Sequence, residues 1–147
     1  EWGMNNRLKM NTMIFTTDLT YLVRGGRLSK AAGSFGNLLN ICPIIEFNIN
    51  GALVVKDKIR TKKKAMKALV NIIRNDLIED FDTRNEIYVI HTHAYEDALE
   101  LQKMLSKKLS DYKGEIKIYE IGTTIGSHLG PGSVGLAFWS KTRNTQG

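Results

Sequence analysis

One glycine-rich segment, residues 126–132, limits the folds open to this chain more than any other stretch. It places His128 between glycines and a proline, directly before the apolar run 133–139. Such a composition is unfavourable in a helix interior, because there glycine lowers helix stability by about 1 kcal/mol and proline by about 3 kcal/mol relative to alanine. Glycine also tolerates backbone dihedrals and close approaches that other residues resist. The segment predicts a turn with a short helix over 122–129 and then a buried strand over 134–140.

Strand-like and helix-like patterns alternate along the rest of the chain. Short β-rich or alternating runs predict strands at 12–17, 43–49, 52–59, 86–92 and 115–121. Helical spacing and capping residues predict helices at 18–26 (capped by Asp18), 30–39, 63–81 and 96–109, with residues 1–11 as the tail of another helix. Asn50-Gly51, between two of the strands, is a strong hairpin signal. The expected fold class is α/β, a mixed β-sheet with packed helices, in one domain over 1–140 with a frayed tail over 141–147.

Basic residues concentrate in one part of the chain. The net charge is +6, and much of the excess lies in residues 56–67. Such a run attracts phosphates, but no aromatic residues interleave with the lysines to stack bases. The pattern favours the solvated face of an amphipathic helix over a nucleic-acid-binding module. A docking surface for an acidic partner protein is a third interpretation.

Length and composition indicate the number of domains and the cellular compartment of the protein. At 147 residues the chain is long enough for one domain. No apolar run approaches the roughly 18 residues that a membrane span needs, and no signal-peptide pattern opens the chain, so no transmembrane segment is expected. The single cysteine, Cys42, excludes an internal disulfide and fits a reducing compartment, which indicates a cytoplasmic protein. Glu1-Trp2-Gly3 is not a natural translation start, so we expect a piece of a longer protein.

Two glycine turns carry the main candidate site residues. Arg24 and Arg27 flank Gly25-Gly26, and the planar fork of arginine suits a carboxylate or a phosphate. His128 in the second turn can donate a hydrogen bond to an anion. These residues predict an anion site. The alternatives are that an arginine pairs with a structural carboxylate or a helix end, and that His128 bonds backbone carbonyls of its own turn.

Weaker candidates lie elsewhere. The hydroxyls of Ser127 and Ser29 could serve the site, although either can simply cap a helix. Arg60 ends the second strand of the hairpin and, on sequence alone, is equally a surface residue. His91 and His93 could mimic a metal pair, because alternate residues of a strand face the same side, but with one further histidine and one cysteine in the chain we expect no metal site there.

Four segments occur in an order typical of one family: 18–32, 39–45, 58–60 and 125–132. Together they resemble the DegV family of fatty-acid-binding proteins, and only its C-terminal half. The resemblance implies a carrier rather than an enzyme, with a long-chain fatty acid in an apolar tunnel and no cofactor. It also implies a separate fatty acid kinase that makes the acyl-phosphate, and an N-terminal domain of the same protein that is absent from this chain.

The resemblance also implies site residues. In the family, the positions matching Arg27, Arg60 and His128 lie around the lipid head group and the kinase docking site. We expect these three side chains to face a common cavity, with Ser127 and Arg24 as weaker members of the same mouth.

The rival interpretation is a small hydrolase or phosphotransferase that uses His128 as a general base. No Gly-x-Ser-x-Gly elbow, P-loop or paired-carboxylate motif supports it. We therefore expect a binding protein without catalytic residues and without a metal. The nucleic-acid-binding module stays as a further alternative.

Overall fold

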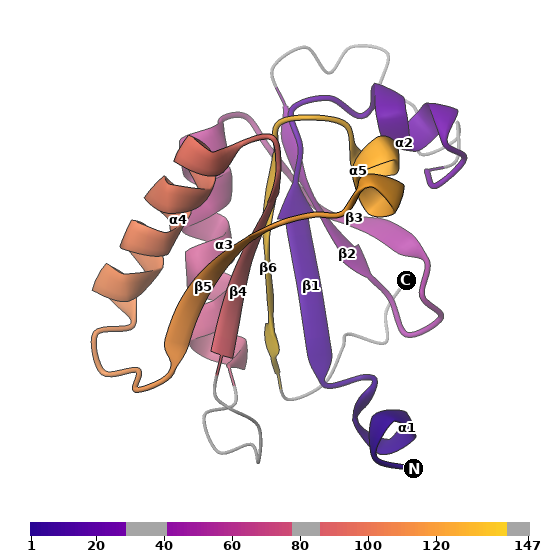
Figure 1. Ribbon diagram of the computed structural model, residues 1–147. Helices are drawn as coiled ribbons and strands as arrows, with labels where there is room; N and C mark the ends of the chain where they lie inside the picture. The colour runs from indigo at the N-terminus through magenta and orange to yellow at the C-terminus, as the bar shows by residue number, and fades with distance from the viewer. Residues whose placement is uncertain (29–40, 78–85, 141–147) are drawn as a thin grey trace.

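Six strands form one mixed sheet in the order β3-β2-β1-β6-β4-β5 (Figure 1). The computed structural model describes residues 1–28, 41–77 and 86–140. The strands are β1 (Met10–Phe15), β2 (Cys42–Phe47), β3 (Leu53–Ile59), β4 (Glu86–Thr92), β5 (Glu115–Glu120) and β6 (Ser133–Trp139). Neighbouring strands are antiparallel, except that β4 and β5 are parallel and are joined through a helix. The predicted α/β fold class with a mixed sheet is confirmed.

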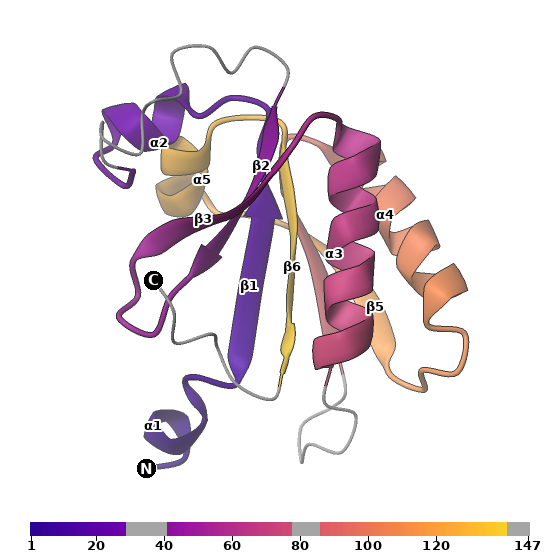
Figure 2. The same cartoon turned by 180° about the vertical axis from the view of Figure 1, so that it is seen from behind.

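Helices cover the two faces of the sheet unequally. They are α1 (Trp2–Asn6), α2 (Thr20–Arg24), α3 (Lys62–Asp76), α4 (Tyr95–Lys108) and α5 (Thr123–Leu129). The long helices α3 and α4 lie side by side along one face, whereas the short α2 and α5 lie at one end of the other face (Figure 1 and Figure 2). Among the helices of the described ranges, none has the length and apolar character to cross a membrane.

The face under α3 and α4 is the main core. Side chains alternate between the two faces along each strand, so each central strand contributes to both. The largest buried side chains of the main core include Phe15, Phe138, Met66, Leu69 and Leu101. A smaller cluster on the opposite face contains Ile14, Leu22, Leu28, Ile45 and Leu129. Through this second cluster, α2 and α5 pack onto the sheet.

The hairpin predicted at Asn50-Gly51 is present, but its loop is longer than two residues. β2 and β3 pair in antiparallel register. The N–H of Asn48 donates to the oxygen of Ala52 at 2.9 Å, and the N–H of Gly51 donates to the oxygen of Asn48 at 3.0 Å. Gly51 has a φ of +78°, so it is the left-handed residue that follows the turn in a three-residue hairpin loop. The Asn48–Ala52 bond therefore encloses three residues, 49–51, and the strands end at Phe47 and start again at Leu53, short of the predicted ends at residues 49 and 52.

Helix α3 is shorter than its periodicity predicts. The apolar spacing predicts a helix over 63–81, but the helix ends at Asp76. Leu77 is extended, forms a bridge with Ser140 and packs against the main core. Pairing with a distant segment therefore ends the helix, and residues 78–81 lie outside the described residues.

The N-terminal segment also differs from its prediction. The helical tail expected over 1–11 is confined to α1, because Met10 pairs with Trp139 and already belongs to β1. The helix expected over 30–39 and the tail over 141–147 lie outside the described residues.

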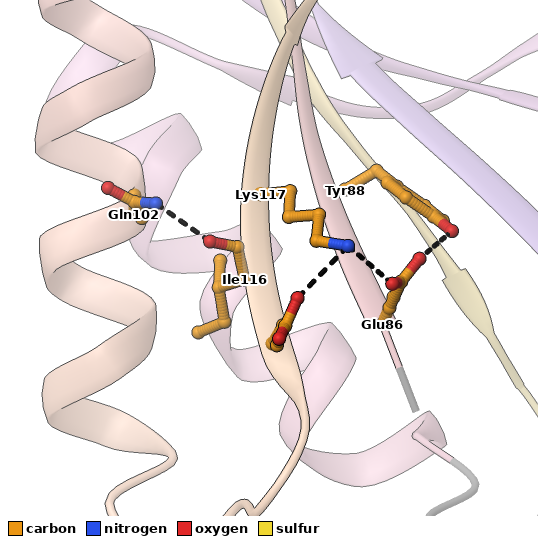
Figure 3. Close-up of polar contacts among 6 residues, drawn as sticks. Glu86, Tyr88, Gln102, Ile116 and Lys117 are labelled. Carbon is orange, nitrogen blue, oxygen red and sulfur yellow. Dashed lines mark hydrogen bonds and ion pairs between the residues drawn. The ribbon is translucent and has the colours of Figure 1, made fainter. Parts of the chain in front are cut away.

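A polar cluster fixes the β4–β5 edge of the sheet (Figure 3). Nζ of Lys117 lies 2.5 Å from Oε1 of Glu86 and 3.0 Å from Oε2 of Glu115, and the Tyr88 hydroxyl donates to Glu86. Hydrogen bonds to these carboxylates raise the pKa of Lys117, and the bond to Glu86 raises the pKa of Tyr88. The amide of Gln102 ties α4 to a backbone oxygen of β5 at 2.8 Å. The cluster thus anchors β5, which leads directly into α5.

Candidate ligand-binding site

Local hydrogen bonds start α2. The Thr16 hydroxyl accepts from the N–H of Asp18 at 3.2 Å, and Oδ1 of Asp18 accepts from the N–H of Thr20 at 2.8 Å. Hydrogen bonds from Thr20 lower the pKa of the Asp18 carboxyl, and the nearby charge of Arg24 lowers it further. The helix starts later than the predicted residue 18: its N-cap is Leu19, which makes no side-chain cap bond, and Asp18 instead accepts from the first N–H of α2.

Gly25 and Gly26 end α2 and turn the chain back. Gly26 has a φ of +68°, the left-handed region that favours glycine. The N–H groups of Gly26 and Arg27 donate to the oxygens of Val23 and Leu22 at 3.1 and 2.9 Å, as in a helix C-cap. The turn sets Arg27 beside the end of its own helix.

A buried hydroxyl holds the glycine-rich turn after α5. Thr92, at the end of β4, donates to the oxygen of Gly130 at 2.6 Å and accepts from the N–H of Ser133 at 3.0 Å. Gly130 itself has a φ of +73°. The turn that follows His128 is therefore fastened to β4. Sequence reasoning missed this role, because the partners are about forty residues away along the chain and Thr92 carries no local signal for them.

Between the α2–α5 pair and the second face of the sheet lies a hollow of about 910 Å³. Strands β1, β2, β3, β4 and β6 and both helices contribute to its walls. Its apolar lining includes Ile14, Ile45, Phe47, Leu53, Ile90 and Ala137. Ligand pockets in proteins typically span about 300–1,000 Å³ and are mostly apolar with a few polar groups. The hollow therefore has the size and character of a site for an apolar ligand.

Arg27 and His128 are the ionisable residues that line this hollow in the described chain. The exposed guanidinium of Arg27 donates from Nη1 to the oxygen of Gly25 at 2.7 Å. His128 is half-buried in the last turn of α5, and a Cβ built on Gly25 would lie 2.6 Å from its Nδ1. Both side chains thus lie next to Gly25, His128 from α5 and Arg27 from the turn that follows α2. Together they offer hydrogen-bond donors to an anionic group at the rim of the hollow.

Three other predicted site residues, Arg60, Arg24 and Ser127, are not among the residues that line this hollow, and Ser29 lies outside the described residues. Arg60 is exposed just after β3, and Arg24 is exposed at the end of α2. The Ser127 hydroxyl donates to the oxygen of Thr124 at 2.9 Å, within its own helix. That bond matches the alternative, helix-internal role that the sequence allowed for Ser127. A part for these three residues in ligand binding stays a prediction.

A second hollow, of about 480 Å³, lies where β4 and β5 end. His91, His93 and Glu120 line it; His91 is buried, and its Nδ1 accepts from the N–H of Ala94 at 3.3 Å. Within the ranges that the structure describes, no three side chains of the metal-binding types are grouped to hold an ion. The bond from Ala94 ties His91 to the turn between β4 and α4. Elsewhere, Cys42 is buried, and burial raises the pKa of its thiol.

The fold and the site define an α/β protein with an apolar ligand hollow on one sheet face, closed at one end by two short helices. A family model described as "Uncharacterised protein, DegV family" matches residues 2–141. The chain belongs to the DegV family. A DegV domain-containing protein of Streptococcus pyogenes serotype M1 is 43% identical over 121 residues, which cover 82% of this chain and 41% of that protein.

Solved structures show the same fold. The crystal structure of a fatty acid binding DegV family protein from Streptococcus agalactiae has a TM-score of 0.76 at 37% identity and covers 91% of this chain and 46% of its own. The fatty acid kinase B3 protein of Streptococcus pneumoniae, loaded with linoleic acid, has a TM-score of 0.78 at 19% identity, covering 94% of this chain and 47% of its own. This second likeness concerns the fold alone. The chain spans less than half the length of these relatives.

Proposed function

We propose that this chain is the C-terminal half of a fatty-acid carrier. The acyl chain lies in the hollow on the second sheet face, and its carboxylate meets Arg27 and His128 at the rim. The observation that carries the proposal is an apolar hollow of about 910 Å³ whose ionisable lining residues, in the described chain, both come from the α2–α5 region. The fatty acid binding relative from Streptococcus agalactiae, at 37% identity, supports the same ligand class.

Burial of the acyl chain supplies most of the affinity. Each methylene removed from water contributes about 0.8 kcal/mol, whereas hydrogen bonds to a charged head group contribute about 1.5–3 kcal/mol. A long-chain fatty acid is therefore held by its tail, while its head stays reachable at the rim. The carrier needs no cofactor and no metal for this, and it has no catalytic role of its own.

The partner in this proposal is a fatty acid kinase, which brings its own nucleotide and metal and converts the presented carboxylate to an acyl-phosphate in the cytoplasm. The support is the family resemblance at Arg27, Arg60 and His128. The printed name of the pneumococcal neighbour links that protein to fatty acid kinase. We assign Arg60, Arg24 and Ser127 to the outer part of the polar mouth, where the kinase docks.

The rest of the tunnel wall comes from an N-terminal domain. This chain covers 41% of the Streptococcus pyogenes relative and 46% of the Streptococcus agalactiae structure. In the proposed whole protein, residues 1–140 form the C-terminal domain, and the other half completes the enclosure of the acyl chain.

Lipid analysis tests the proposal directly. The whole protein, in which this chain is joined to its N-terminal half, is purified from a bacterial host and denatured, and the released lipid is identified by mass spectrometry. We expect fatty acid in the wild type and less of it in Arg27→Ala and His128→Ala. Adding a fatty acid kinase and ATP to the loaded protein is then expected to yield acyl-phosphate. Absence of fatty acid, or ester hydrolysis that His128→Ala abolishes, would contradict the carrier function.

A further inference from the structure

Two ring side chains bridge α2 and α5. Each ring lies against the glycine that follows the other helix. Tyr21 of α2 lies over Gly130, where an added Cβ would stand 2.6 Å from Cγ of the tyrosine. His128 of α5 lies over Gly25, where an added Cβ would stand 2.6 Å from Nδ1 of the histidine. Real Cβ atoms do not approach other atoms so closely. The two glycines, Gly25 and Gly130, are called the ring sockets below.

The Gly130 socket is fastened to the sheet. Its oxygen accepts the hydroxyl of Thr92 at 2.6 Å, and its N–H donates to the oxygen of Gly126 at 2.8 Å. Its φ of +73° lies in the region that glycine adopts without strain. The ring of Tyr21 therefore rests on a fixed piece of backbone rather than on a flexible side chain.

Tyr21 lies outside the described lining of the hollow, in contrast to its neighbour Leu22. The Tyr21 residue is 39% exposed, whereas Leu22 is fully buried. The backbone of Tyr21 is nevertheless tied to the second socket, because its oxygen accepts the N–H of Gly25 at 2.8 Å. A shift of Tyr21 on Gly130 therefore moves the socket that receives His128.

We propose that Tyr21 is a positioning residue for His128. Its ring fixes the spacing of α2 and α5 and so keeps the imidazole of His128 against Gly25, beside the rim of the hollow. The inference rests on the proposed function for the identity of the anionic group, a fatty-acid carboxylate. The tyrosine acts through the shape of its ring, so its hydroxyl is not required.

The test compares two ligands that differ at the head group, palmitic acid and hexadecanol. The ratio of their dissociation constants measures the contribution of the head group and cancels losses that affect the tail alone. We call this ratio the head-group preference. A hydrogen bond to the charged carboxylate is expected to make palmitic acid bind about tenfold or more tightly than hexadecanol. We expect Tyr21→Ala and Gly25→Ala each to lower this preference about tenfold, and Tyr21→Phe to retain it. Gly25 has a φ of −74°, which alanine adopts freely, so Gly25→Ala acts through its added Cβ.

A matched control lies on the same helix. At Gly126, one turn before Gly130, an added Cβ would meet nothing closer than 3.7 Å, so Gly126→Ala is expected to keep the preference of the wild type. Adding Tyr21→Ala to His128→Ala is expected to lower the preference no further, because both changes remove the same contact. Retention of the preference in Tyr21→Ala, or its loss in Tyr21→Phe, would overturn the proposal.

A measurement without ligand separates this proposal from the proposed function. The chain has three histidines, and the ring resonances of His128 are assigned by NMR through their loss in His128→Ala. We expect these resonances to shift in Tyr21→Ala and Gly25→Ala, to match the wild type in Tyr21→Phe, and the other two histidines to stay in place. If the wild type binds neither ligand, the carrier function fails while the shifts still decide the role of Tyr21. Unchanged His128 resonances in Tyr21→Ala and Gly25→Ala would refute that role.

Discussion

At the scale of single residues, the Thr92 hydroxyl decides the route of the chain between α5 and β6. It bonds the oxygen of Gly130 and the N–H of Ser133, both of them buried. A buried backbone group without a partner costs free energy comparable to a lost hydrogen bond. The turn that carries the chain away from His128 therefore depends on one hydroxyl from another strand.

We expect Thr92→Val to lower the free energy of unfolding by about 1–3 kcal/mol, because valine keeps the shape of threonine and leaves both backbone groups without their partner. Thr92→Ser keeps the hydroxyl and is expected to lose less. Urea unfolding followed by circular dichroism measures both variants. Equal stability of Thr92→Val and the wild type would contradict the assigned role.

The Asp18 carboxylate makes stability depend on pH in one direction. Hydrogen bonds from Thr20 hold its pKa in the folded chain below the ordinary value of 3.8. A lowered carboxyl pKa adds stability above the unfolded pKa, and this stability is lost as the pH falls through the folded pKa. The stability difference between the wild type and Asp18→Asn is therefore expected to be constant above about pH 5 and to shrink below about pH 4.

Because Asp18 is exposed, this difference is expected to stay below about 1 kcal/mol. Asparagine keeps an oxygen that can accept from the N–H of Thr20, so the variant isolates the charge. Chemical unfolding at a series of pH values measures the difference. Growth of the difference on acidification would contradict the sign.

At the scale of elements, the hairpin loop illustrates how backbone conformation selects a residue. Gly51 has a φ of +78°, and a Cβ placed there would meet nothing within 4 Å. A larger residue at this position therefore meets no steric clash, and its cost is backbone strain of about 1–2 kcal/mol for an ordinary L-residue.

We expect Gly51→Ala to lower the free energy of unfolding by about 1 kcal/mol, and Gly51→Asn to lower it by less, because asparagine enters the left-handed region more readily. Thermal unfolding of the two variants beside the wild type measures the order. If alanine is tolerated as well as asparagine, left-handed strain is not what selects glycine in this loop.

Elements with local patterns were predictable from the sequence, and boundaries set by distant partners were not. Gly51 predicts the β2–β3 hairpin, and the acidic first turn and basic last turn predict α4. The end of α3 depends on the pairing of Leu77 with Ser140, and the start of β1 on the pairing of Met10 with Trp139. Neither partner is visible in the local periodicity.

At the scale of the whole molecule, the candidate site was predictable only where its geometry is local. The glycine turns that carry Arg27 and His128 have clear sequence signals. The apolar wall has none, because the sheet order brings together isoleucines of β1, β2 and β4 that are far apart along the chain. The contact of Tyr21 with Gly130 depends on how α2 meets α5, which no residue pattern specifies.

Filling the hollow is expected to block long acyl chains. Ala137 of β6 lines the hollow and pairs with Thr12 of β1 and Tyr88 of β4. A phenylalanine ring there occupies space that the tail needs, so Ala137→Phe is expected to weaken palmitic acid binding about tenfold or more, the equivalent of about two methylenes. Octanoic acid, as a shorter control ligand, is expected to lose less. Equal loss for both acids in calorimetric titrations would contradict the assigned path of the tail.

Completeness of the hollow is expected to set the overall affinity. This chain covers 46% of the Streptococcus agalactiae structure, so in isolation part of the proposed tunnel wall is open. We expect the chain alone to bind palmitic acid much more weakly than the same chain joined to the N-terminal half of a DegV protein. Titration of both proteins measures the difference. Equal affinities would mean that this half alone holds both tail and head group.

Within the described residues, long helices lie along one face of the sheet and two short helices lie at one end of the other, so part of this second face has no covering layer there. Under the proposed function, the lipid and the N-terminal half together cover that part of the face. A ligand that binds only the folded chain adds about 2.7 kcal/mol of stability at a hundredfold excess over its dissociation constant. Copies that lose their cargo unfold more often and meet proteases sooner than filled copies. Under the proposed function, the lifetime of the carrier in the cell is therefore expected to follow the lipid supply.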